Sequence, residues 1–477
     1  QARLRRNLSP TSYVELGGLI SSDELERTAF SSDPAERRSE TRTLAFERAY
    51  LRYVSRSSSG EDLRATPWVG HDRSELVARF GSTPTVLESS TTQFGLRVNH
   101  RARATAHVTT NTGFDFEAAS SSLRRAGSIS TPPREGDARV FGQPPSDQVN
   151  VSEWKTLQAS AAPYVEADFE LFENKVNLMP GLRLGPFFTS VDQRVPAEAD
   201  VPKVGAYSGE LALEPRLALR YEPNQRVTFK AAWGRYYQQS QAEDLSPVFG
   251  NPLLGLESST HYLVGANVNL SKVLAVETTA FYSRSHDLAV RNPSSAPKIA
   301  ETLVSGGEGR AYGAQFLIRR ELADRVFGWI AYTILRSERK DSPDGDWRLF
   351  DFDQTHVLTA LASYDLGNGF EIGGRFRFST GYPRTPVVGA YYDARTARYE
   401  PVLGEKNTER IPSFWQLDAR LSKRFKIAKT ELEIYADVQN VTNRENAEEI
   451  VYSQDYSQKR YIEGLPILPV VGAHWEF

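Results

Sequence analysis

The chain has 477 residues and a formal net charge of −3, and it contains 24 Phe and 21 Tyr but one Met and no Cys. The near-neutral charge gives no support for nucleic-acid binding, and the lack of Cys excludes a disulfide framework and a Cys-based metal site. The longest apolar run, residues 465–473, is far shorter than the roughly 20 residues of a transmembrane helix. A helical membrane protein is therefore excluded, whereas a membrane β-barrel fits because only every second strand residue faces lipid.

Residues 1–44 are charged and Ser-rich, with one candidate strand at 13–20. A solvated loop is the simpler interpretation of this segment, and an early barrel strand is the alternative. No basic stretch followed by an apolar stretch stands at the start, so we expect any export signal to be removed or to lie outside this sequence. The barrel is expected over residues 45–477, and no segment is identified as a separate plug domain.

Alternation of polar and apolar residues predicts strands through the rest of the chain. Over 102–118 the even positions are small or apolar and the odd ones are polar, and the same period of two recurs in 415–425 and 431–439. In the last segment the apolar positions are Leu432, Ile434, Ala436 and Val438, and the polar positions between them include Glu433, Tyr435 and Asp437. Such segments would each present one face to lipid and one to a wet lumen.

The links between these strands alternate in length. Short links are expected near 99–101, 173–175, 222–225, 271–272, 322–324, 367–369 and 426–429, and long polar ones over 120–154, 190–208, 240–256, 286–307, 338–353, 381–412 and 443–465. Tight periplasmic turns and long extracellular loops are typical of outer-membrane barrels. A propeller would need a fixed repeat, and a sandwich usually has strands of about five or six residues. The sequence thus predicts an all-β fold, a transmembrane antiparallel barrel with about 16 visible strands.

The chain finishes within a predicted strand. Its apolar face consists of Val471, Ala473, Trp475 and Phe477. Most domains end in a frayed polar tail, so a terminal strand that includes the last residue suggests a strand that pairs with the first one and closes a barrel.

Several segments, in this order, resemble the barrel of a TonB-dependent outer-membrane receptor. They are APYVEADFELFENKVNLMPGLRL from Ala162, AAWGRYYQQ from Ala231, NPLLGLESSTHYLVGANVNL from Asn251, GRAYGAQFLIRR from Gly309, FDFDQTHVLTALASYDLGNGFEIGGRFRFSTGYPRTPV from Phe350, YADVQNVTNRENAE from Tyr435 and the terminal GLPILPVVGAHWEF. The resemblance covers roughly residues 160–477 well and residues 1–159 poorly.

The resemblance implies a multi-pass barrel in the outer-membrane lipid of a Gram-negative bacterium that imports a bulky, scarce ligand such as a metal chelate, cobalamin or a glycan. Energy would come from the inner membrane through TonB and a plug that is not in this chain. It also implies that Val471, Ala473, Trp475 and Phe477 form the signal read by the barrel-assembly machinery. Receptors of this type resemble plugged barrels of about 22 strands, so we expect another polypeptide or a precursor fragment to supply the plug and the remaining strands.

Two other functions stay open at this stage. A plugless or split barrel could serve as a scaffold subunit of a multisubunit outer-membrane complex, and an open pore for passive diffusion is the third interpretation. We expect no enzyme, because the chain has no Gly-x-Ser-x-Gly, His-Glu-x-x-His or Walker motif. DSPDGDW at 341–347 lacks the spacing of a calcium loop and is interpreted as a turn.

No catalytic, cofactor-binding or metal-binding residue is predicted. His107 and His474 are expected on inward strand faces, where hydration of the lumen is the ordinary role. Charged residues predicted to point inward are Arg375, Arg377, Asp418, Arg420 and Asp437. They would contact a plug or line a wet channel.

Overall fold

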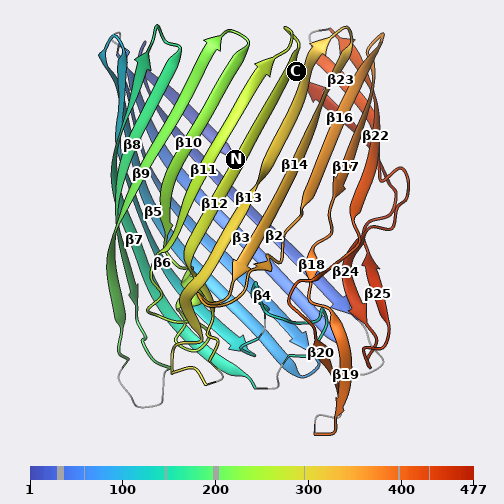
Figure 1. Ribbon diagram of the computed structural model, residues 1–477. Helices are drawn as coiled ribbons and strands as arrows, with labels where there is room; N and C mark the ends of the chain where they lie inside the picture. The colour runs from blue at the N-terminus through green and yellow to red at the C-terminus, as the bar shows by residue number, and fades with distance from the viewer. Residues whose placement is uncertain are drawn as a thin grey trace.

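The computed structural model describes residues 1–29, 37–57, 60–130, 132–145, 148–196, 203–294, 296–395, 398–428 and 430–476. Within these ranges, a single 20-stranded antiparallel sheet curls into a barrel (Figure 1). Its strands are β1 (Ala2–Ser9), β2 (Ser12–Ala29), β3 (Arg38–Arg56), β4 (Asp62–Phe80), β5 (Thr83–Thr105), β6 (Val108–Gly127), β7 (Asn150–Leu171), β8 (Val176–Val191), β9 (Ala206–Asn224), β10 (Val227–Gln238), β11 (Glu257–Asn269), β12 (Leu274–Arg291), β13 (Leu303–Ala323), β14 (Val326–Lys340), β15 (Arg348–Leu349), β16 (His356–Gly367), β17 (Phe370–Ser379), β22 (Phe414–Ile427), β23 (Thr430–Gln439) and β26 (Leu468–Glu476).

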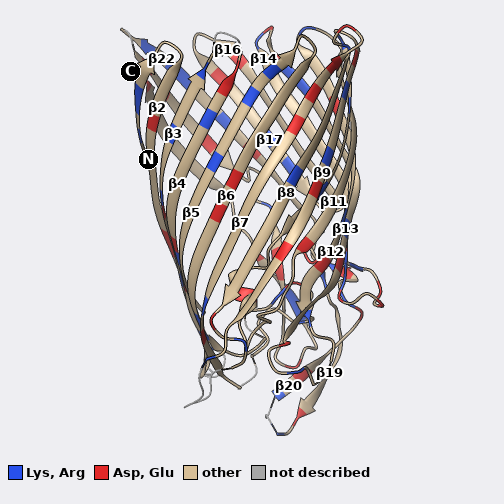
Figure 2. Cartoon of the chain, turned by 90° about the vertical axis from the view of Figure 1, so that its left-hand side faces the viewer, with Lys and Arg blue, Asp and Glu red and all other residues tan. Residues whose placement is uncertain are grey.

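The remaining elements are small and belong to the loops. A 3₁₀ helix, η2, covers Ala242–Leu245, and three two-stranded ribbons pair β18 (Pro383–Arg384) with β21 (Glu409–Arg410), β19 (Val387–Asp393) with β20 (Arg398–Leu403), and β24 (Ala447–Tyr452) with β25 (Lys459–Glu463). The β19–β20 hairpin projects furthest from the barrel (Figures 1 and 2). Among the described residues, no helix is long and apolar enough to cross a membrane.

Neighbouring strands in the sequence are neighbours in the sheet, and their links differ in length at the two ends. Short turns join them at the upper end of Figure 1, and long loops gather at the lower end, which we call the mouth. The turn Asn368–Gly369 has φ values of 53° and 78°. Positive φ at both central residues defines the hairpin turn whose twist matches that of its strands, so this turn fixes the register between β16 and β17.

The period-two alternation of β23 matches its position in the barrel wall. Ile434 is 44% exposed on the outward face, which is the face available to lipid. Tyr435 points into the lumen, where the Arg420 guanidinium stacks 4.0 Å from its ring and donates a hydrogen bond of 3.1 Å to Glu433. Apolar residues outside and paired charges inside are the arrangement that a membrane barrel requires, and the predicted barrel fold is confirmed.

Aromatic side chains lie across glycines of the next strand on the luminal face. Tyr435 covers Gly472, its cross-strand partner, so closely that a Cβ on Gly472 would lie 2.4 Å from the Tyr435 hydroxyl. Tyr50 covers Gly17 in the same way between β2 and β3. Such aromatic cover of a strand glycine fixes the register of the pair.

We predict that Gly472→Ala destabilises the attachment of β26 by about 1–3 kcal/mol, because the added methyl overlaps the Tyr435 ring. The loss should appear as a lower temperature of heat-modified migration on gels. Gly209→Ala is the matched control, since a Cβ at that strand position meets no atom within 4 Å. Equal shifts for the two variants would show that the aromatic cover does not hold β26.

Three expectations require correction. The sheet has twenty strands rather than about 16, and two of the additional strands are β1 and β2, so residues 2–29 follow the alternative of early barrel strands and not that of a solvated loop. The turn expected at 99–101 lies at 106–107, since β5 runs on to Thr105. His107 is therefore in a turn and not on an inward strand face. The first 44 residues are highly charged, and this composition favoured the loop interpretation. In the barrel, the polar face of these strands lines a wet lumen.

The two edge strands of the sheet, β1 and β26, lie on the same side of the barrel, near the chain ends marked in Figure 2. Within the described residues, β1 pairs with β2 alone and β26 with β23 alone. All residues of β1 and nearly all of β26 are exposed. The expectation that the last strand pairs with the first is therefore wrong for these residues, and the wall is open along one line, which we call the seam.

Candidate functional site

The mouth is anchored by an apolar cluster on the inner side of the wall. Leu123 of β6 and Trp154 of β7 are 3% and 1% exposed, and they pack with Leu245 of η2. The Trp154 indole donates a hydrogen bond of 3.0 Å to the Ala242 carbonyl. These contacts give the 239–256 loop an apolar support on the inner side of the barrel wall.

A second loop, residues 128–149, which we call the crossing loop, leaves β6 and binds distant elements of the mouth. Arg134 forms a two-pronged ion pair with Asp244 beside η2, with Nη2 2.9 Å from Oδ2, and also donates to the Ala289 carbonyl. Arg291, at the end of β12, donates two hydrogen bonds of 3.0 Å to Asp137. The crossing loop is thus held by charge-assisted pairs, which are stronger than neutral hydrogen bonds.

Arg348 of β15 joins its own loop, residues 341–355, to the crossing loop. Its side chain is 7% exposed and lies 2.8 Å from Glu135 of the crossing loop, 2.6 Å from Asp341 and 3.4 Å from Asp351. Asp351 accepts a 3.0 Å hydrogen bond from the backbone amide of Gly136. We call Arg348 and its three carboxylates the arginine hub.

The loop at 380–413 is attached to the hub through the same carboxylates. Lys406 lies 2.8 Å from Asp341, and the Asn407 amide donates a 2.7 Å hydrogen bond to Asp351. Acidic and basic residues therefore lie side by side in the loops at the lower end of Figure 2. The mouth is closed over part of its width by loops that share one buried cation.

The pKa values of Asp341 and Arg348 are both shifted in the direction that favours their charged forms. Burial alone would raise the pKa of Asp341, but hydrogen bonds from Arg348 and Lys406 outweigh burial and hold that pKa below its usual value. Burial alone would lower the pKa of Arg348, but its bonds to Asp341 and Glu135 raise it instead. Both shifts favour the charged forms, so the loops are held by ion pairs rather than by neutral contacts.

Deeper in the barrel than the loops, a luminal cavity of about 520 Å³ extends across the inner face from β4 to β10. Arg183 lies 2.5 Å from Asp115, and Arg216 lies 3.1 Å from Glu214 and 5.0 Å from the Tyr236 ring. The rest of the lining is rich in amides and aromatic rings, and includes Trp68, Gln93, Gln158, Phe187, Gln238 and Gln241. The cavity can accept hydrogen-bonding groups and flat apolar surfaces, and its guanidinium groups are already paired with carboxylates.

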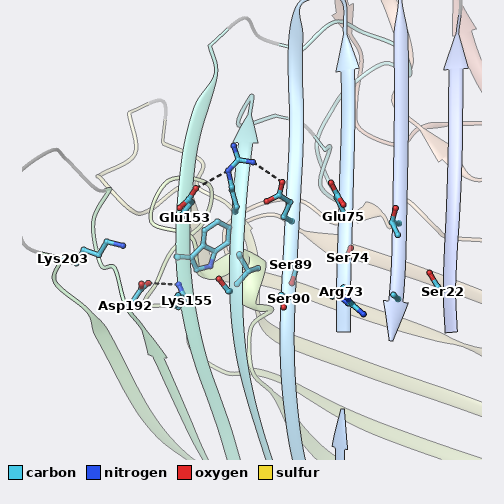
Figure 3. A pocket seen from close by; sticks show the side chains of 17 residues that line it. Ser22, Arg73, Ser74, Glu75, Ser89, Ser90, Glu153, Lys155, Asp192 and Lys203 are labelled. Carbon is cyan, nitrogen blue, oxygen red and sulfur yellow. Dashed lines mark hydrogen bonds and ion pairs between the residues drawn. The ribbon is translucent and has the colours of Figure 1, made fainter. Parts of the chain in front are cut away.

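A larger cavity, about 900 Å³, lies near the loop end of β2 to β8 (Figure 3). Arg124 of β6 is 3.2 Å from both Glu88 and Glu153, its partners on the adjacent strands. Because strand side chains alternate, these residues face away from Leu123 and Trp154, and therefore outward. Figure 3 shows Asp192 beside Lys155, whose backbone amide donates it a 2.7 Å hydrogen bond. This outer surface is polar, and Arg124 is paired with carboxylates on both sides.

The structure places the predicted terminal residues on β26. Val471, Ala473 and Trp475 share the outward face and pair with Ala436, Ile434 and Leu432, whereas Phe477 lies outside the described residues. Their role in assembly stays a prediction.

Two of the predicted inward cations meet at one carboxylate. Arg375 lies 2.7 Å from Asp418, and Arg377 lies 3.8 Å from the same carboxylate. His474 is 3.9 Å from Glu476. Over the described ranges, no group of three or more His, Asp or Glu side chains is placed to hold a metal ion.

The sequence interpretation missed the arginine hub. Arg348 and Glu135 are separated by 213 positions, and neither lies in a recognisable motif. The only local signal was the acidic run at 341–347, which contains Asp341 and was interpreted as a turn. Buried ion pairs between distant loops have no sequence periodicity, so no pattern could have joined these residues.

Comparison with known proteins places the chain in a family. The family model described as TonB dependent receptor-like, beta-barrel matches residues 5–441. A search of curated proteins finds no match.

Among solved structures, the chain is similar to the siderophore receptor PiuA from Acinetobacter baumannii, with a TM-score of 0.66 and 12% identity over 99% of this chain and 73% of that one. The FrpB iron transporter from Neisseria meningitidis gives a TM-score of 0.68 and 13% identity over 99% and 71%. The ferric citrate transporter FecA gives 0.66 and 14% over 99% and 75%. At these identities the structural likeness shows the fold alone, and the family match supplies the assignment. The chain therefore belongs to the TonB-dependent receptor family and corresponds to the outer-membrane β-barrel of these receptors.

Proposed function

We propose that this barrel imports a bulky, scarce ligand across the outer membrane of a Gram-negative bacterium, with energy delivered by TonB. The observation that carries the proposal is that ion pairs around the arginine hub hold three loops together across part of the mouth, next to a polar lumen. A permanently open pore would not need such ion pairs between its loops. Metal chelates, cobalamin and glycans are the candidate ligands, and the likeness to receptors named for siderophores and ferric citrate supports a metal chelate.

The residues of the chain would act in two stages. Ligand arriving at the mouth would first meet the loops at 128–149, 341–355 and 380–413, which the hub holds together. Release of the crossing loop would then expose the luminal cavity, whose amides and rings can receive the ligand. We propose that TonB acts through a plug supplied by another polypeptide or by another part of a precursor, so that the energy-dependent step would lie outside the barrel wall.

A transport assay in the native bacterium tests this function. Deletion of the gene should abolish uptake of one radiolabelled ligand among a ferric siderophore, cobalamin and an oligosaccharide, and a protonophore or loss of TonB should do the same in the parent strain. Uptake that persists without the proton gradient would indicate a passive pore. Normal uptake of all three classes in the deletion strain would contradict the import proposal.

The seam supports a second proposal, that further strands complete the wall. Each unsatisfied backbone group exposed to lipid costs several kcal/mol, and β1 and β26 both present an unpaired edge. We propose that another polypeptide, or another part of a precursor, pairs with these edges and brings the plug. A scaffold role in a multisubunit complex would use the same edges and is the alternative.

Engineered cysteines can test closure cleanly because the chain has none of its own. Single cysteines along β26 should crosslink to a peptide other than β1, identified by mass spectrometry of the purified complex. Disulfides between β26 and β1 in a sealed, empty barrel would contradict the completion of the wall by further strands and the import proposal that needs a plug.

We also propose that Val471, Ala473, Trp475 and Phe477 form the signal for the barrel-assembly machinery. The exposed edge of β26 supports this role, since an unpaired strand edge can bind a second chain by strand addition.

A further inference from the structure

The outward face of β10 to β14 carries a row of aromatic residues. Trp233, Tyr262, Tyr282 and Tyr312 are successive cross-strand partners, and the rings of the three tyrosines follow one another at 6.2 Å and 6.5 Å. All four are at least 36% exposed. Aromatic girdles of membrane barrels lie where the hydrocarbon meets the headgroups, so this aromatic row marks the outer boundary of the membrane.

The direction of these side chains follows from the strand itself. Tyr236 of β10 lines the luminal cavity and packs 4.9 Å from the His261 ring. Side chains alternate along a strand, so Trp233 and Arg235 point to the opposite, outward side. Their cross-strand partners share that side.

A row of cations lies two residues further toward the mouth on the same strands. Arg235, Thr260, Arg284, Arg310 and Glu338 are successive cross-strand partners. Arg336 of β14 is the partner of Tyr312 and adds a guanidinium at the end of the aromatic row. We call Arg235, Arg284, Arg310 and Arg336 the cationic row. Two residues along a strand correspond to about 7 Å, which places it at headgroup level.

The cationic row contains an arrangement that costs stability. Arg284 and Arg310 are direct cross-strand partners, and like charges placed opposite each other are destabilising. Two carboxylates relieve part of the repulsion: Glu308 lies 2.9 Å from Arg284, and Glu338 lies 2.5 Å from Arg310 and 2.7 Å from Arg336. Positive charge still exceeds negative charge within the row and its partners.

Another part of the barrel wall shows the contrast. At the corresponding rim of β5 to β7, Arg124 has a carboxylate, Glu88 or Glu153, as its partner on each side. There two carboxylates flank one guanidinium group, whereas in the cationic row four guanidinium groups share two carboxylates, and within the described residues Arg235 forms no ion pair. Arg235 stands 5.1 Å from the Tyr237 ring, and Arg310 stands 4.2 Å from the Trp347 ring, so aromatic faces orient both guanidinium planes.

We propose that the cationic row is a binding site for a phosphorylated lipid headgroup of the surrounding outer leaflet. Guanidinium groups bind phosphate through paired hydrogen bonds, and basic clusters at the membrane boundary recognise anionic headgroups. The acyl chains of such a lipid would lie along the apolar outer wall, on the side of the aromatic row that faces away from the mouth. This site is independent of ligand import and would hold the barrel to an annulus of anionic lipid.

The test compares the full-length protein with Arg235→Gln/Arg336→Gln after incorporation into phosphatidylcholine nanodiscs doped with bis-phosphorylated lipid A. This pair leaves Arg284–Glu308 and Arg310–Glu338 intact, so no carboxylate loses its last partner. Native mass spectrometry counts the lipid A molecules retained per barrel. We expect retention to fall about fivefold for each cation removed, and to weaken as salt is raised.

Arg124→Gln is the matched control and should retain lipid A as the parent does. Heat-modified migration checks that all variants are folded. Should the double variant misfold, Arg235→Gln alone gives the same comparison with one cation. Equal retention in variant and parent would overturn the proposal, and so would equal displacement of lipid A by inorganic phosphate, which would indicate a site for free phosphate instead of a membrane lipid.

Discussion

Arg348→Met is expected to release the crossing loop from the mouth while leaving the barrel wall folded. The substitution keeps an apolar chain of similar length but leaves Glu135, Asp341 and Asp351, which are partly exposed, without their shared guanidinium. Removing one partner of a fully buried ion pair typically costs about 3–5 kcal/mol. We expect a smaller cost here, because solvent screens the carboxylates and Asp341 keeps Lys406 as a partner. That cost falls on the closed arrangement of the loops, since the strands are held by their own hydrogen bonds.

Hydrogen exchange followed by mass spectrometry measures the effect directly. Amides of the crossing loop, including Gly136, which donates to Asp351, should exchange faster in Arg348→Met, and those of β12 to β14 should not change. Arg348→Lys should give an intermediate result, because lysine keeps the charge but cannot bind carboxylates with a planar fork. In planar bilayers, Arg348→Met should also conduct more than the parent.

Arg395→Met is the control for this prediction. Arg395 is another loop arginine with a carboxylate partner, 3.1 Å from Asp393, but its side chain is 90% exposed. Exposed ion pairs contribute about 0–1 kcal/mol, so its loss should leave exchange in the crossing loop unchanged. If the two variants behaved alike, the hub would not be what closes the mouth.

The barrel could be predicted from the sequence because its signal is local. Each wall strand alternates with a period of two, as 431–439 does. The lipid-facing and lumen-facing residues of such a strand can therefore be assigned from that segment alone. Within residues 2–29, only 13–20 was identified as a candidate strand, because the alternation elsewhere is interrupted by charges, which a lumen filled with water tolerates. Glu15 illustrates this: it is 5% exposed, yet it accepts a hydrogen bond from the Tyr50 hydroxyl on the luminal face.

The mouth and the cationic row could not be predicted, for a related reason. Arg348 depends on a carboxylate 213 positions away, and the cationic row depends on the register of five strands. A shift of one residue in any pair would move a side chain to the other face. Sequence alone gives the period of each strand but not the register between strands, so it cannot align Arg284 with Arg310.

The second large effect concerns lipid contact. Ile318→Arg should block assembly of the barrel, because Ile318 lies on the outward face of β13 between the apolar partners Val276 and Ile330. It shares the face of Tyr312 and stands six residues further from the mouth, near the middle of the membrane. An arginine facing lipid at that depth costs about 2–4 kcal/mol.

Gln315→Arg on the same strand is the matched control. Gln315 points to the lumen between Thr279 and Thr333, where an added guanidinium stays hydrated. We therefore expect Gln315→Arg to assemble in near-parental amounts while Ile318→Arg accumulates unfolded, as judged by heat-modified migration of outer-membrane fractions. Equal assembly of both variants would mean that the outward face of β13 does not contact lipid. The aromatic row, which lies on that same face, would then no longer mark the membrane boundary.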